Sequence, residues 1–220
     1  MNGLQRMGGV SALIEAATFL IGFGLFSSML APAISADIDP VQKVAFLAEN
    51  QALLYASNVI LYLIFGIFLV VLVLALYERL KAVSPAMMQT ATAFGLIWAG
   101  LVIASGMIAN IGTGIVVDLY AKDPTQAGWA WLAIEAVVDG LGGGNEFVGA
   151  LWVLLISWVA LRGGGLPRVL NYLGVLIGVA GIVTIVPALG ELGAVFGLGL
   201  IVWFIWVGIV LLRSKPGAAA

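Results

Sequence analysis

Cysteine and histidine are absent from this 220-residue sequence. The chain therefore has no thiol nucleophile, no disulfide, no imidazole acid–base group and no Cys/His ligands for zinc, iron–sulfur clusters or haem. A metal ion would need oxygen ligands, which restricts the choice to hard cations. From these absences we predict no bound cofactor and no metal site.

Charged residues are also scarce, at 9% of the chain against 63% hydrophobic residues. A soluble domain has about 25% charged residues, because its surface faces water. The mean hydropathy is +1.17. Most of this chain must therefore lie in the lipid bilayer, which is its expected partner. The net charge of −2 provides no basic stripe, which excludes nucleic acid as a partner.

Apolar runs of about 20 residues are long enough to cross a bilayer. Their positions predict an all-α membrane bundle with six transmembrane helices in a single domain over residues 1–220. The predicted spans cover residues 9–31, 52–77, 86–117, 143–161, 169–189 and 192–212. The first run, followed by "APAISA", also resembles a signal peptide. It is longer than a usual signal sequence and contains Glu15, so we expect it to be retained as the first span.

Lysine and arginine are distributed unevenly between the two sides of this bundle. One side has Arg6, Arg79, Lys81, Arg162, Arg168, Arg213 and Lys215, and the other has only Lys43 and Lys122. Cytoplasmic loops have the excess of basic residues, so both termini are predicted to be cytoplasmic. An odd number of spans would not produce this division.

A second helical segment precedes the fourth predicted span. Residues 127–139 are compatible with a helix and begin with Trp129 and Trp131, and tryptophan favours the membrane interface. We expect the third span and this segment to form a helical hairpin that protrudes beyond the outer membrane surface. Gly140 and the glycines at 142–144 would then form the bend where the chain re-enters the bilayer.

Polar residues at bilayer depth need a reason, because a charge there costs at least about 2.5–3.5 kcal/mol on insertion scales. An outer layer is predicted to contain Asn58, Asn110, Asn145, Glu146 and Glu191. In one interpretation the acids cap helix starts and the amides form interhelical hydrogen bonds. Alternatively, the set lines a cavity that binds a cation or a polar small molecule. For Glu146 a functional role is favoured, since irregular backbone at this depth usually lines protein or water.

A second polar set is predicted near the cytoplasmic side. Glu15 lies about two turns into the first span, at the depth of Arg168 and Asn171. A contact with either residue would offset the cost of burying the acid; the alternative is a proton-carrying carboxyl. The depth difference between Glu15 and Glu146, about 12 Å at 1.5 Å of rise per residue, argues against a two-carboxylate hydrolase.

Glycines form small-residue faces on the last two spans. They are Gly174, Gly178 and Gly181 on the fifth, and Gly193, Gly197 and Gly199 on the sixth. Such faces let helices approach closely. We expect packing within the hairpin of these two spans, with self-association as the alternative.

Four stretches resemble a known family. They read "QRMGGVSALIEAATFLIGF", "GLGGGNEFVGALWVLLISW", "GLPRVLNYLGVLIGVAGIVTIVP" and "GLGLIVWFIWVGIVLL". Together they make the chain similar to the domain of unknown function 4386 family of small bacterial membrane proteins. The resemblance implies a compact six-span bundle in the bacterial inner membrane. It implies no activity, ligand or catalytic residue.

Three functions remain open on this sequence. The first is a non-enzymatic membrane protein that binds or conducts a cation or polar small molecule through the outer layer. The second is a structural subunit that docks a second copy or another membrane protein through its glycine faces and hairpin. The third is an intramembrane enzyme using carboxylates with Tyr55, Tyr62 or Tyr172. We favour the first and expect no enzyme activity.

Overall fold

A computed structural model describes residues 3–31, 38–143 and 146–213 of the chain. Within these ranges all regular structure is helical, which confirms the all-α part of the predicted fold class. The α-helices are α1 (Gly3–Ser28), α3 (Pro40–Glu49), α4 (Gln51–Asn58), α5 (Phe65–Leu80), α6 (Pro85–Tyr120), α7 (Pro124–Val138), α8 (Phe147–Gly163), α9 (Arg168–Val183) and α10 (Leu192–Arg213). Three shorter elements are η1 (Val59–Ile64), η2 (Asp139–Gly143) and η3 (Pro187–Leu189).

Five helical stretches are long and apolar enough to cross a membrane. They are α1, the continuous run Gln51–Leu80, α6, the run Pro124–Gly163 and α10. The predicted span at 169–189 is shorter than expected, because α9 ends at Val183 and is followed by the 3-10 turn at Pro187. Proline lacks the N–H that a continuing helix needs, so the last residues of the predicted span turn instead.

Asp-Pro pairs begin two of the helices at the end of the molecule that is opposite to the chain termini. Asp39 caps α3 by accepting a hydrogen bond from Val41 N at 2.9 Å, and Asp123 caps α7 by accepting one from Gln126 N at 3.0 Å. In both cases proline is the next residue. An N-cap acid followed by proline at the first helical position is favourable because proline has no N–H to leave unpaired.

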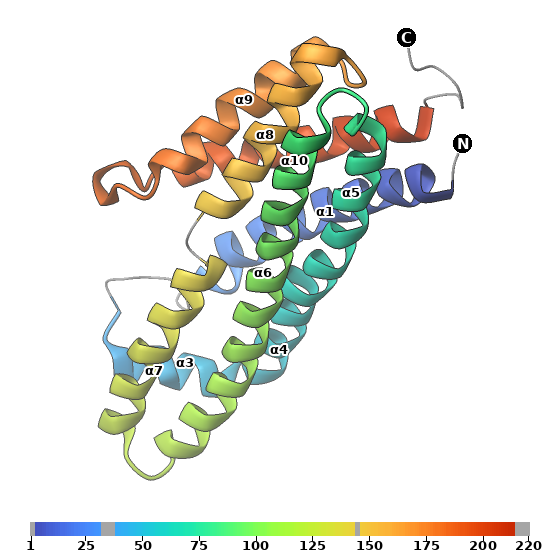
Figure 1. Cartoon of the computed structure of the whole chain (residues 1–220). Coiled ribbons are helices and arrows are strands. Elements are labelled where there is room, and N and C mark those ends of the chain that lie inside the picture. Colours follow the sequence, from blue (N-terminus) through green and yellow to red (C-terminus); the bar gives the residue numbers. More distant parts are fainter. Residues whose placement is uncertain (1–2, 32–37, 144–145, 214–220) are drawn as a thin grey trace.

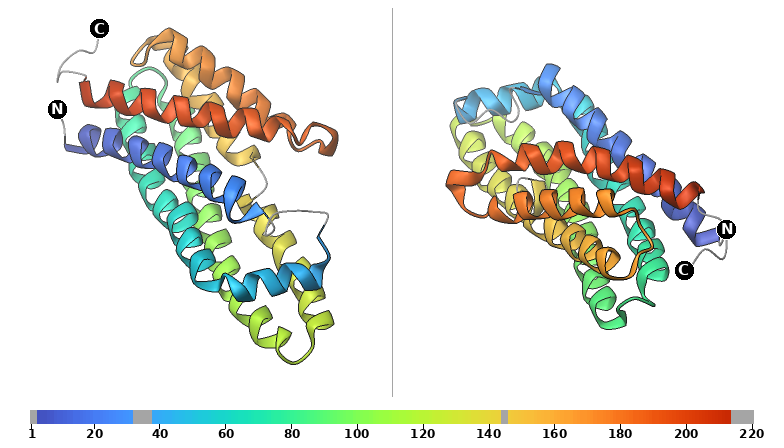
Figure 2. Two further views of the ribbon diagram at one scale, coloured as in Figure 1. Left: turned by 180° about the vertical axis from the view of Figure 1, so that it is seen from behind. Right: turned by 90° about the horizontal axis from the view of Figure 1, so that it is seen from above.

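The helices are arranged around the long α5–α6 pair (Figure 1). Helices α1 and α10 run side by side and antiparallel, and they cross this pair (Figure 2). Gln5 Nε2 donates to Leu211 O at 3.2 Å, and Arg79 Nε donates to Gly165 O at 2.6 Å. The two termini and the α5–α6 and α8–α9 turns therefore share one end, called here the terminal end. The opposite end, with α3 and the α6–α7 turn, is the distal end.

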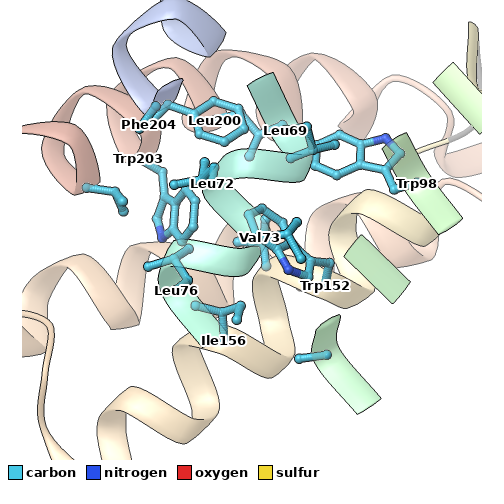
Figure 3. Packing of buried hydrophobic residues seen from close by; sticks show 14 of the residues in the cluster. Leu69, Leu72, Val73, Leu76, Trp98, Trp152, Ile156, Leu200, Trp203 and Phe204 are labelled. Carbon is cyan, nitrogen blue, oxygen red and sulfur yellow. The ribbon is translucent and has the colours of Figure 1, made fainter. Parts of the chain in front are cut away.

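The main hydrophobic core fills the space between α1, α5, α6, α8, α9 and α10. Figure 3 shows Trp98, Trp152 and Trp203 gathered around the leucines of α5. The ring centroid of Trp152 lies 5.8 Å from that of Trp98 and 5.7 Å from that of Trp203. These spacings are within the range in which aromatic rings attract one another beyond the burial of their surface. Tilted and edge-to-face contacts between these rings thus join α6, α8 and α10.

A smaller core lies at the distal end, between α3, α4, α6 and α7. Beside it, Lys43 Nζ on α3 contacts Glu135 Oε1 on α7 at 2.7 Å. The two side chains are only 7% and 22% exposed. A capped amphipathic helix and a mostly buried ion pair therefore hold the distal end together. The predicted spans leave residues 32–51 without a helix, so neither α3 nor this ion pair was predicted.

The glycine faces of α9 and α10 are in contact with other helices of the same chain. A Cβ at Gly174 would overlap Ser157 Oγ of α8, and one at Gly199 would overlap Ile177 of α9. Gly197 faces Phe23 and Phe19 of α1 instead. The glycines therefore serve packing within the chain, as expected, although α8 and α1 share these contacts with the hairpin.

Candidate functional site

Asn58 and Asn110 form a direct pair between neighbouring helices. Asn58 Nδ2, at the end of α4, donates to Asn110 Oδ1 on α6 at 2.9 Å, and the pair is partly buried. Within a membrane such a bond contributes about 0.6 kcal/mol on average. The structure thus brings together two of the predicted site residues, as an interhelical hydrogen bond.

The six residues after Asn58 form the π-helix η1, which lies against α6. Tyr62 of η1 packs on Gly106, where any Cβ would overlap the Cβ of the tyrosine. The missing side chain at Gly106 therefore admits Tyr62 between the two helices. π-Type turns are rare and occur frequently at functional sites. The surroundings of Tyr62 are therefore a candidate site.

The second break in helical bonding, η2, packs against the same helix. Gly142 has φ 145° and ψ 10°, a backbone conformation that only glycine adopts without strain. On α6, Ser105 Oγ donates to Val138 O at 3.1 Å in a buried position. This hydrogen bond ties the end of α7 to α6. The predicted glycine bend is therefore real at Gly142; Gly144 lies outside the described residues.

Glu146 follows this break at the start of α8. Its side chain makes no capping hydrogen bond to the helix, contrary to the interpretation of the outer acids as caps. Instead, its Cγ lies 3.8 Å from the position that a Cβ would occupy at Gly193 of α10. Glu146 is therefore turned toward the first turn of α10 and away from the backbone N–H groups of its own helix.

Tyr62 and Asp139 start from the same stretch of α6, because Tyr62 packs on Gly106 and Asp139 follows Val138, whose carbonyl is bonded to Ser105. Glu146 comes seven residues after Asp139, at the start of α8, and α8 also packs on α6. Within the described residues, the ion pairs are Lys43–Glu135 and Lys81–Glu78. Asp139 and Glu146 take part in neither of these two ion pairs.

The other predicted members of the outer layer are placed differently. Glu191 is exposed, in the hairpin that joins α9 to α10. Asn145 lies outside the described residues. Tyr62 was considered in the sequence only as an enzymatic group, and Ser105 was missed because a serine within a long apolar run gives no signal of its partner.

The predicted contact of Glu15 with Arg168 or Asn171 is wrong. Glu15 is fully buried and neither carboxylate oxygen has a hydrogen-bond partner within the described residues. Asn171 donates to Leu166 O at 3.2 Å instead, and Arg168 is exposed. The two helices occupy different positions around the bundle: α1 packs on α5 and α10, whereas α9 packs on α8 and α10. Equal depth did not mean equal position around the bundle.

The described residues contain no group of three or more Asp and Glu side chains that could hold a metal ion. A cation at the Tyr62–Asp139–Glu146 cluster would therefore combine two carboxyl groups with hydroxyl, amide or backbone oxygens. Oxygen ligands of this kind suit hard cations.

The apolar helices and their polar breaks define the class of an all-helical membrane protein. Within that class, the chain belongs to the family described as domain of unknown function DUF4386, whose model matches residues 7–213. No curated protein and no solved structure matches the chain. The family resemblance seen in the sequence is thereby confirmed.

Proposed function

We propose that this protein is a six-span bacterial inner-membrane protein that binds or conducts a cation or a small polar, positively charged molecule. The site would be the cluster of Tyr62, Asp139 and Glu146, with the Asn58–Asn110 pair one turn away. The carrying observation is that η1 and η2, two breaks in long apolar helices, pack against the same stretch of α6, where Tyr62 meets Gly106 and the residue before Asp139 is bonded to Ser105.

The distribution of basic residues supports the proposed orientation, with both termini in the cytoplasm. The ends of α1 and α10, the α5–α6 turn and the α8–α9 turn meet at the terminal end. Their basic residues include Arg6, Arg79, Arg162 and Arg213, and Lys122 lies in the turn at the distal end. Cytoplasmic loops have the basic excess, so the proposed site faces the outer leaflet.

The count of six spans requires α9 to cross the membrane although it has only 16 residues. At 1.5 Å per residue it is about 24 Å long, less than the hydrocarbon thickness of about 30 Å. Ile185 and Val186, which are apolar and exposed, extend its apolar surface beyond the last turn. A short span is accommodated by local thinning of the bilayer. The protruding α6–α7 hairpin belongs to the same topology.

The cationic character of the ligand follows from charge. A carboxylate at membrane depth is costly unless it is neutralised, and no basic side chain is bonded to Asp139 or Glu146 within the described part of the chain. A bound cation or proton would remove that cost. Among the described residues no hydrogen bond joins Tyr62 to a carboxyl group, so the arrangement supports binding rather than acid–base catalysis.

The proposal is tested in liposomes containing the purified chain, with flux of protons and of monovalent cations followed by fluorescent indicators. Glu146→Gln removes the charge at nearly constant volume and is expected to abolish flux or cation-dependent thermal stabilisation. Glu191→Gln is the matched control, because Glu191 is exposed at the neighbouring hairpin. If the parent shows neither flux nor cation-dependent stabilisation, or if both variants behave like the parent, the proposal is wrong.

A further inference from the structure

A groove between α1 and α5 lies at the terminal end, far from the proposed cation site. It forms a cavity of about 260 Å³ with an almost wholly apolar lining. Its lining includes Gly3, Arg6, Val10 and Ser11 of α1 and Phe68 and Val71 of α5. The two helices touch where Gly8 meets Ala75, and the groove opens beside that contact.

The groove faces the surroundings of the protein. Met7 and Val10 on its α1 edge are 55% and 44% exposed. In a membrane-spanning chain, apolar side chains exposed on the outside of the bundle contact lipid. An apolar groove in that position fits a hydrocarbon chain better than a polar solute.

Arg6 is the charged residue among those that line the groove. Its side chain is exposed and takes part in no ion pair within the described ranges. A guanidinium binds phosphate through two parallel hydrogen bonds. Basic pockets between transmembrane helices on the cytoplasmic side bind the head groups of anionic lipids.

We propose that this groove binds one anionic phospholipid of the membrane. Its acyl chain lies between α1 and α5 along Val10 and Phe68, and its phosphate is held by Arg6. The site shares no residue with the Tyr62–Asp139–Glu146 cluster, so the two proposals fail or succeed independently.

Native mass spectrometry of the purified chain with phosphatidylglycerol or phosphatidylcholine tests the role of Arg6. Arg6→Gln is expected to weaken phosphatidylglycerol binding about fivefold, the effect of one basic residue at an anionic surface. Binding of phosphatidylcholine should stay near its parent value. Arg213→Gln is the control, since Arg213 is exposed at the same end but lies outside the groove. Equal losses in both variants, or none in Arg6→Gln, would overturn the proposal.

A groove-filling variant tests the acyl chain. A Cβ at Gly3 meets no atom within 4 Å, so Gly3→Leu adds apolar volume at the groove without a clash. It is expected to reduce binding of both lipids, whereas inorganic phosphate should not compete with phosphatidylglycerol. Parent-like lipid binding by Gly3→Leu, or displacement of the lipid by inorganic phosphate, would show that the groove does not hold the acyl chain.

Discussion

The two ends of this bundle are held together by different forces. Toward the terminal end, fully buried Trp152 and Trp203 meet edge to face in a core of apolar side chains (Figure 3). Toward the distal end, an ion pair joins Lys43 to Glu135 and an amide pair joins Asn58 to Asn110. The helical breaks η1 and η2 lie between these regions.

The difference separates a rigid part of the chain from an adjustable one. Close-packed aromatic and aliphatic side chains have few alternative arrangements, whereas polar groups can exchange one hydrogen-bond partner for another or for a ligand. A site for a polar ligand is therefore expected beside the second kind of contact, and Tyr62, Asp139 and Glu146 lie there.

The largest effect on stability is expected from the aromatic core. Trp152→Ala removes a fully buried ring from between Trp98 and Trp203, and such truncations cost about 3–5 kcal/mol because they leave a cavity. Trp129→Ala is the control, since Trp129 is 69% exposed. Thermal unfolding in detergent should separate the two variants clearly. Equal losses would contradict the assignment of the tryptophan core as the rigid region.

A substitution at the break between α7 and α8 is expected to have the next largest effect on stability. Gly142→Ala forces a side chain into φ 145°, where the strain costs about 1–3 kcal/mol. Gly140→Ala, two residues away, meets no atom within 4 Å and has no positive φ. It is expected to leave the unfolding temperature unchanged or slightly raised. A stable Gly142→Ala protein would show that the break does not need glycine.

Breaking the distal ion pair should have a smaller effect. Lys43→Met leaves Glu135 mostly buried without its partner, and we expect a loss of about 1–2 kcal/mol, between the values for exposed and buried pairs. The double variant Lys43→Met/Glu135→Leu should recover most of that loss, because apolar replacement of both partners is often neutral. Faster hydrogen exchange in α3 and α7 of the single variant would localise the effect. A double variant as unstable as the single one would contradict this account.

Single introduced cysteines are expected to have the smallest effect on stability. They also report directly on the orientation of the chain in the membrane. The natural chain has none, so an introduced thiol is unique. Lys122→Cys and Lys81→Cys lie in turns at opposite ends, and such surface changes leave stability nearly unchanged. A membrane-impermeant thiol reagent should label Lys122→Cys in intact spheroplasts and Lys81→Cys only after permeabilisation. The reverse pattern would overturn the proposed orientation.

Hydrophobicity along the chain predicted most helices to within a few residues. The run 86–117 corresponds to α6 at Pro85–Tyr120, and 192–212 to α10 at Leu192–Arg213. The helix predicted at 127–139 and the bend after it are present as α7 and the break at Gly142. These features depend on local composition, which the sequence contains directly.

Contacts between helices were predicted less well, because depth in the membrane does not determine which helices are neighbours. Asn58 and Asn110 were placed in one layer, and they do meet. Glu15 and Asn171 were also placed in one layer, yet Glu15 has no hydrogen-bond partner among the described residues, and α1 and α9 both pack on α10. The helix α3 was missed because its ten residues are too short and too polar to stand out in a membrane protein, although Asp39-Pro40 is a helix-start pattern.

The kink at Gly142 also has a mechanical meaning. An unbroken helix transmits a push or a twist along its axis, but the chain from Pro124 to Gly163 is interrupted where its backbone leaves the helical region. The two helices α7 and α8 are therefore mechanically separate, and α7 is tied to α6 near the joint by the Ser105 hydroxyl. A load applied to the exposed turn at Lys122 would reach Trp98 along the unbroken α6, whereas the path through α7 to α8 is interrupted at the joint.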